Sequence, residues 1–168
     1  MACPYESPVE LVTYEAADKI DKDLLGDWVT YHKDGSKEEL TLTKATKTVY
    51  HVYHDEYGPK NKKKASNYYR AYLTSINDIP IFNVESKDGK YYFFNYAWTG
   101  KNTFYIQAVN NDYVEENFKV DSVTTANLKK FLEDNIQKAE LFDEKIEFIR
   151  KNSPEDELQK AYFRKSGF

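Results

Sequence analysis

The stretch Leu24-Leu25-Gly26-Asp27-Trp28-Val29-Thr30-Tyr31-His32 is the first segment of the chain with the composition of a β-strand. Aromatic and β-branched residues favour the pleated, half-buried surface of a sheet. The strand predicted at 25–33 ends at Asp34-Gly35. This dipeptide favours a two-residue type I′ hairpin, because both of its residues tolerate a positive φ. The segment therefore predicts a first strand that turns directly into a second.

Short strand-like segments separated by turn residues continue along most of the chain. We expect further strands at 37–44, 48–54, 67–76, 79–85, 90–98, 103–109 and 113–120. Short connections require neighbouring strands to be antiparallel. A meander of eight strands leaves two exposed edges unless it closes on itself, and closure as an up-and-down barrel removes both. The sequence thus predicts an all-β fold built on an eight-stranded antiparallel barrel.

Helical patterns appear towards the C-terminus. The apolar residues Leu128, Phe131, Leu132 and Ile136 have the spacing of one helical face. A second, short helix is expected at about 154–164, with Ser153 as its N-cap and Pro154 at its first position. The predicted domain organisation is a tether and lead-in segment over 1–23, followed by the barrel with its C-terminal helices over 24–168.

Residues 140–150 fit two interpretations. Phe142, Ile146 and Ile149 have a spacing that extends the preceding helix. Alternatively, 145–150 is a strand with Ile146, Phe148 and Arg150 on one face. The sequence leaves both open.

Composition limits the classes of function. The net charge of −4 disfavours a nucleic-acid-binding protein, which normally carries a basic face. The chain has no apolar run of 18 residues, and it lacks a glycine-rich phosphate loop and a nucleophile motif. Adjacent carboxylates on a strand point to opposite faces, so none forms an acid/base couple. The sequence therefore gives little support for an enzyme, and we expect no cofactor.

The three histidines do not suggest a metal site. His51 and His54 are three residues apart on a predicted strand and so point to opposite faces. His32 is placed to meet His51 across strands, but no cysteine is available there as a third ligand. We therefore expect polar, hydrogen-bonded histidines and no bound metal.

Aromatic side chains are the strongest indication of a binding site, since the chain has 15 Tyr, 10 Phe and 2 Trp. The candidate ligand-binding residues are Arg70, Tyr72, Tyr96, Trp98, Tyr105 and Gln107. Facing the interior, they would form a pocket with apolar walls and a few polar tips. Facing outward, they would need cover from the C-terminal helices. A buried Arg70 would require an acidic partner or an anionic ligand.

The fragment Gly26-Asp27-Trp28 on the first strand, the meander over 25–120 and the helix after it together resemble the calycin superfamily, the lipocalins and their relatives. The resemblance implies that Trp28 plugs the closed end of the barrel. It also implies that a late arginine packs over the Trp28 ring. Arg150 is in roughly the right late position, although it follows the helix instead of preceding it.

The sole cysteine, Cys3, precedes a polar segment with two prolines, which is similar to the start of a mature bacterial lipoprotein. In that interpretation Cys3 carries the lipid and the protein lies in the periplasm or at the outer membrane. In the other, Cys3 is a free thiol at a frayed terminus of a cytoplasmic protein. With no second cysteine, an intramolecular disulfide is excluded.

The expected function is binding or carriage of a small apolar or aromatic ligand inside the barrel of a monomeric envelope protein. Lipocalin-like lipoproteins are generally binding or carrier modules, and this is what the resemblance implies. The alternative is a non-catalytic interaction module, whose filled barrel binds a protein or glycan through its aromatic surface. The run from Lys60 to Lys64 either attracts an anionic group or is a solubilising loop.

Overall fold

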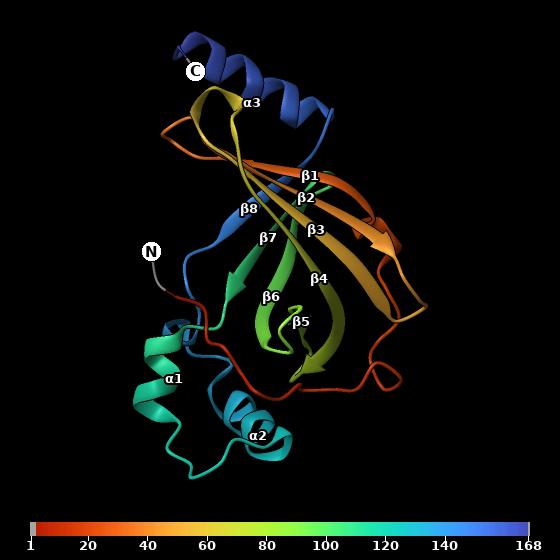
Figure 1. Ribbon diagram of the computed structural model, residues 1–168, viewed down its shortest axis with the longest axis vertical. Coiled ribbons are helices and arrows are strands. Elements are labelled where there is room, and N and C mark those ends of the chain that lie inside the picture. The colour runs from red at the N-terminus through yellow and green to blue at the C-terminus, as the bar shows by residue number, and fades with distance from the viewer. Residues whose placement is uncertain (1–2, 168) are drawn as a thin grey trace.

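The strands pair with their neighbours in the chain and close into a barrel (Figure 1). The computed structural model describes residues 3–167, and over this range it forms eight strands, all antiparallel to their neighbours. The predicted fold class is therefore confirmed. The strands are β1 Gly26–Tyr31, β2 Lys37–Lys44, β3 Val49–Tyr57, β4 Lys63–Ile76, β5 Ile79–Glu85, β6 Tyr91–Gly100, β7 Thr103–Ala108 and β8 Ile146–Arg150.

The eighth strand is not where the meander pattern predicts it. The strand expected at 113–120 is wrong, because Asn111–Asn117 forms helix α1, capped by the Asn110 side chain, which accepts from the backbone N–H of Tyr113. The strand alternative for 145–150 is the correct one: β8 pairs with β7 on one side and with β1 on the other. Trp28 lies opposite Arg150 in this last pairing. Without β8 the edges of β1 and β7 would be unpaired.

The chain turns near Asp34-Gly35 as predicted, but not as a two-residue type I′ hairpin. Residues 32–36 join β1 to β2, and Gly35 has a positive φ while Asp34 does not. The two-residue turn expected between the predicted strands 67–76 and 79–85 is confirmed: Asn77-Asp78 joins β4 to β5, and both residues have positive φ. Asn and Asp are the non-glycine residues that tolerate this conformation best.

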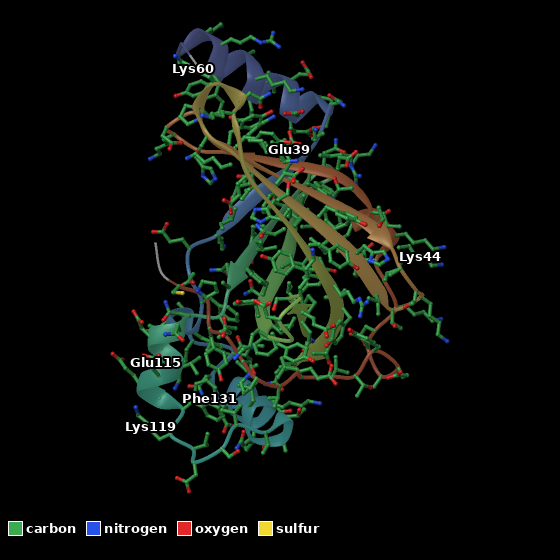
Figure 2. The ribbon with its side chains drawn as sticks, in the orientation of Figure 1. Glu39, Lys44, Lys60, Glu115, Lys119 and Phe131 are labelled. Carbon is green, nitrogen blue, oxygen red and sulfur yellow. The ribbon has the colours of Figure 1, made fainter. Side chains whose placement is uncertain are left out.

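Two helices cover the outer face of one end of the barrel (Figure 1). Helix α2, Thr125–Asn135, carries the predicted apolar face, and Thr124 and Asn127 form a reciprocal capping box at its start. Its buried residues Leu128 and Leu132 pack with outward-facing Ile81 and Phe93 of the sheet. Phe131 of α2 (labelled in Figure 2) packs against Phe118 at the end of α1, with the ring centroids 4.8 Å apart. The barrel wall here is therefore buried on both of its faces.

Helix α3, Pro154–Lys165, lies at the other end of the molecule (Figure 1). Ser153 caps it as predicted by accepting from the backbone N–H of Asp156. Asp156 is fully buried and accepts from the Tyr31 hydroxyl at 2.7 Å, which ties the helix to β1. Three 3₁₀ turns complete the described chain: η1 Lys22–Leu24, η2 Pro59–Asn61 and η3 Ala139–Leu141.

The N-terminal segment lies against the barrel wall and does not project from it. Isolated bridges join Pro4 to Asn110, Ser7 to Tyr91, and Asp18 to Leu73. Residues 1–2 of the predicted tether lie outside the described residues. None of the helices formed by residues 3–167 is long and apolar enough to cross a membrane.

Candidate functional site

One end of the barrel is filled by aromatic side chains around Trp28. The Trp28 ring is fully buried, with Phe104 edge-on at 4.7 Å and Trp98 at 5.9 Å between ring centroids. The indole Nε1 donates to the backbone oxygen of Leu24 at 2.8 Å. This hydrogen bond satisfies the one polar atom of a buried indole. The Trp28 indole is therefore buried in the aromatic cluster with its polar atom satisfied.

Arg150 covers the other side of the same ring. Its guanidinium carbon lies 4.2 Å from the Trp28 ring centroid, a cation–π distance. The guanidinium also donates to the backbone oxygens of Asp23 at 2.7 Å and Leu25 at 3.2 Å. Arg150 thus joins β8, the turn η1 and the start of β1 in one contact.

The geometry explains the glycine of Gly26-Asp27-Trp28. Gly26 has φ +124°, a conformation that side-chain-bearing residues rarely adopt. A Cβ at this position would lie 3.1 Å from Nη1 of Arg150. Glycine therefore suits this position for two reasons: it adopts the backbone conformation, and it leaves room for the guanidinium of Arg150.

Beside this aromatic cluster, the barrel interior holds a cavity of about 480 Å³. Sites for small organic ligands generally measure 300–1,000 Å³ and are mostly apolar. The walls come from inward-facing residues of β2 to β8, among them Leu40, Leu42, Val52, Phe82, Phe94 and Ile106. Ala71 also lines the cavity, and its small side chain leaves room there.

Polar groups gather at the rim, where the N-terminal segment passes. Cys3 and Glu6 line the cavity and are exposed, so the cavity reaches solvent there. Tyr92 also lines it and donates its hydroxyl to Glu6 at 2.8 Å. Burial, followed by this carboxylate, raises the pKa of Tyr92 to about 12. Tyr92 is therefore a neutral phenol at physiological pH.

Glu38 and His54 form a second polar group of the cavity wall. Oε1 of Glu38 lies 3.3 Å from Nε2 of His54, and Oε2 lies 3.2 Å from Nε2 of His32. The hydrogen bond with His54 lowers the pKa of Glu38, although partial burial acts in the opposite direction. The Glu38 side chain is therefore a half-buried carboxylate at neutral pH. His51 faces the outside, where Nδ1 lies 2.5 Å from the Tyr68 hydroxyl.

Two of the predicted ligand-binding residues point inward. Tyr96 packs against Phe82 at 5.0 Å, in the core cluster that includes Trp28. Trp98 contacts Trp28 and donates to Asp21 at 3.3 Å. Both lie on β6 in the aromatic cluster around Trp28, and neither is among the residues that line the cavity described above.

The structure places Arg70 and Tyr72 on the outer face of β4. Arg70 is exposed and interacts with the hydroxyls of Tyr14 and Tyr68. Tyr72 is fully buried, but outside the barrel, where Tyr14 packs edge-on against it at 4.8 Å. Its hydroxyl donates to Glu10 at 2.6 Å. The residues of β4 that line the cavity are instead Tyr69 and Ala71.

Tyr105 and Gln107 also lie on the outside, because the cavity-lining residues of β7 are Phe104 and Ile106. The Lys145 ammonium lies 4.4 Å from the Tyr105 ring centroid. Gln107 donates to the backbone oxygen of Asp143 at 2.9 Å and accepts from the side-chain amide of Asn95. Both residues have partners on the barrel surface and have no contact with the cavity.

Comparisons of the chain with family models, curated proteins and solved structures give no match. The architecture on its own, a closed antiparallel barrel of eight sequential strands with a C-terminal helix, is consistent with a calycin-like fold. Function must therefore be argued from the site, because one fold supports many functions.

Proposed function

We propose that this protein binds a small apolar or aromatic ligand inside its barrel. The cavity is the main evidence for this proposal. It has a volume of about 480 Å³, is lined by aliphatic and aromatic side chains, and has exposed residues at one end. A barrel that served only as a rigid support would gain stability by filling this space, since cavities lose packing energy. The open interior is therefore better explained by a ligand.

The arrangement of polar groups defines the orientation of such a ligand. The end around Trp28 and Phe104 is apolar, while Tyr92, Glu6, Glu38 and His54 lie at the rim. A few placed polar groups at one end of an apolar pocket fix a ligand's orientation. We infer an amphipathic ligand whose apolar part enters first and whose polar group stays at the rim.

We also propose membership of the calycin superfamily, among lipocalin-like bacterial lipoproteins. The packing of Arg150 on Trp28 beside Gly26 supports the membership. The exposed position of Cys3 at the rim supports lipid attachment there and hence a place in the periplasm or at the outer membrane. No nucleic-acid partner is proposed.

A binding titration with a matched pair of variants tests the proposal. Leu40→Trp places an indole in the cavity, whereas Thr43→Trp places one on the exposed outer face of the same strand. We expect the wild type and Thr43→Trp to bind 1-anilinonaphthalene-8-sulfonate with a saturable increase in its fluorescence. Leu40→Trp should bind it at least tenfold more weakly. Equal binding by all three proteins would contradict the proposal.

The second candidate function is an interaction module, and a hollow on the outer face of β3 and β4 favours it. Tyr53 is 47% exposed and lies 5.3 Å from Tyr68 between ring centroids. Polar side chains, including those of Asn67 and Lys87, complete the hollow. Exposed aromatic faces bordered by hydrogen-bonding groups suit a glycan, which would stack on them.

A further inference from the structure

Three metal-ligating side chains meet on the inner face of the barrel, where β2 pairs with β3. Ligand atoms of Glu38, His54 and Glu56 all lie within 4.8 Å of one another. The strand register brings the three residues together. Glu38 is directly opposite Glu56, and His54 lies two residues before Glu56 on β3, so their side chains point to the same face. Glu38 and His54 also line the cavity.

The charges of these two strands are balanced on the outer face and unbalanced on the inner one. Outward-facing Glu39 is paired with Lys37 at 2.8 Å and with Lys151 at 3.2 Å (Figure 2 labels Glu39), and outward-facing Asp55 is paired with Lys63 at 3.1 Å. Among residues 3–167, the ion pairs of Glu38 are with imidazoles alone, and Glu56 has none. Like charges directly opposite on neighbouring strands destabilise a sheet.

A divalent cation bound between the carboxylates of Glu38 and Glu56 would neutralise their repulsion. We propose that Glu38, His54 and Glu56 bind a zinc ion at the rim of the cavity. Zinc accepts imidazole nitrogen and carboxylate oxygen at about 2.0–2.2 Å in a tetrahedron, so two ligand atoms of one ion lie about 3.3 Å apart. The separation of Glu38 Oε1 and His54 Nε2 is 3.3 Å. Calcium would require six or more oxygen ligands, which this group does not offer.

The surrounding residues extend the site. His32 contacts the second oxygen of Glu38 at 3.2 Å and thereby orients the carboxylate, as outer partners of metal ligands do. Three protein ligands leave the fourth position of a zinc tetrahedron open. Since two of the ligands line the cavity, that position lies beside it. A polar group at the rim of the cavity is thus within reach of the metal.

Calorimetric titration of the metal-stripped protein with zinc chloride tests the site. The wild type should bind one equivalent. His54→Ala and Glu56→Gln should each bind at least tenfold more weakly, because each removes one of three ligands. The matched control is His51→Ala, which removes an outward-facing imidazole from the same strand and should leave the affinity unchanged. Circular dichroism of each variant establishes that it is folded.

The site would be overturned by an absence of stoichiometric binding in the wild type, by an equal loss in His51→Ala, or by an undiminished affinity in both ligand variants. The titration is repeated in Cys3→Ser, because a thiolate is also a zinc ligand, and binding that disappears there would assign the ion to Cys3 instead. No apolar ligand is present in this experiment. The titration therefore tests the zinc site independently of the proposed binding of an apolar ligand.

Discussion

At the scale of single residues, Gly26 is the position where backbone conformation and packing act together. We predict that Gly26→Ala lowers the free energy of unfolding by about 1–3 kcal/mol from backbone strain, with a further loss from the contact with Arg150. Gly89→Ala is the control, because Gly89 has φ +73° and a Cβ added there would meet nothing within 4 Å. Urea unfolding of the two variants measures the difference. Equal losses would show that Arg150 does not restrict position 26.

For individual residues, the sequence indicates which side chains of β2 face the barrel interior, but it does not do so for β4. The alternation of Leu40 and Leu42 marks the inner face of β2, and both line the cavity. On β4, aromatic residues occupy both faces, so alternation could not distinguish Tyr69 inside from Arg70 and Tyr72 outside. Tyr72 is buried because the lead-in segment covers it, and this long-range contact leaves no local pattern in the sequence.

At the scale of elements, the start of α3 depends on one buried carboxylate. Burial of Asp156 opposes its ionisation, but hydrogen bonds from Tyr31 and from the backbone of Asn152, with the charge of Lys160, lower its pKa below the usual value. A group with a lowered folded pKa stabilises the fold above its unfolded pKa, about 4, and loses this effect as the pH falls through the folded pKa.

We therefore predict that Asp156→Asn lowers the free energy of unfolding at pH 7 by about 1–3 kcal/mol. The variant should also lose less stability than the wild type between pH 4 and more acidic values. Urea unfolding over this pH range provides the measurement, with Glu144→Gln as an exposed control. An unchanged acid dependence in Asp156→Asn would show that the carboxylate is not ionised in the folded protein.

The elements differ in how far sequence predicts them. Seven strands and two of the helices follow from local patterns, since turn residues and N-caps mark their ends. The eighth strand does not, because Tyr113 to Val120 has β-forming residues while Val114 supports a helix by packing on the outer core. The choice between helix and strand at 146–150 depends on the unpaired edges of β1 and β7, which are distant in the chain.

At the scale of the whole molecule, closure could be predicted and the contents of the barrel could not. A meander of short hairpins has few ways to avoid exposed edges, so the barrel follows from connectivity. The cavity is lined by inward-facing side chains from seven strands. If the inward face of even one strand is predicted wrongly, the predicted lining of the cavity changes. The group formed by Glu38, His54 and Glu56 likewise required the register between β2 and β3.

Native mass spectrometry of the purified protein, followed by extraction of any bound compound, would show whether the barrel holds a ligand. We expect a stoichiometric small molecule that dissociates on denaturation and carries an apolar part large enough to occupy the cavity. A mass equal to the bare chain, together with no thermal shift across a panel of lipids, haems and aromatic compounds, would contradict it. The outer hollow at Tyr53 and Tyr68 would then become the favoured functional surface.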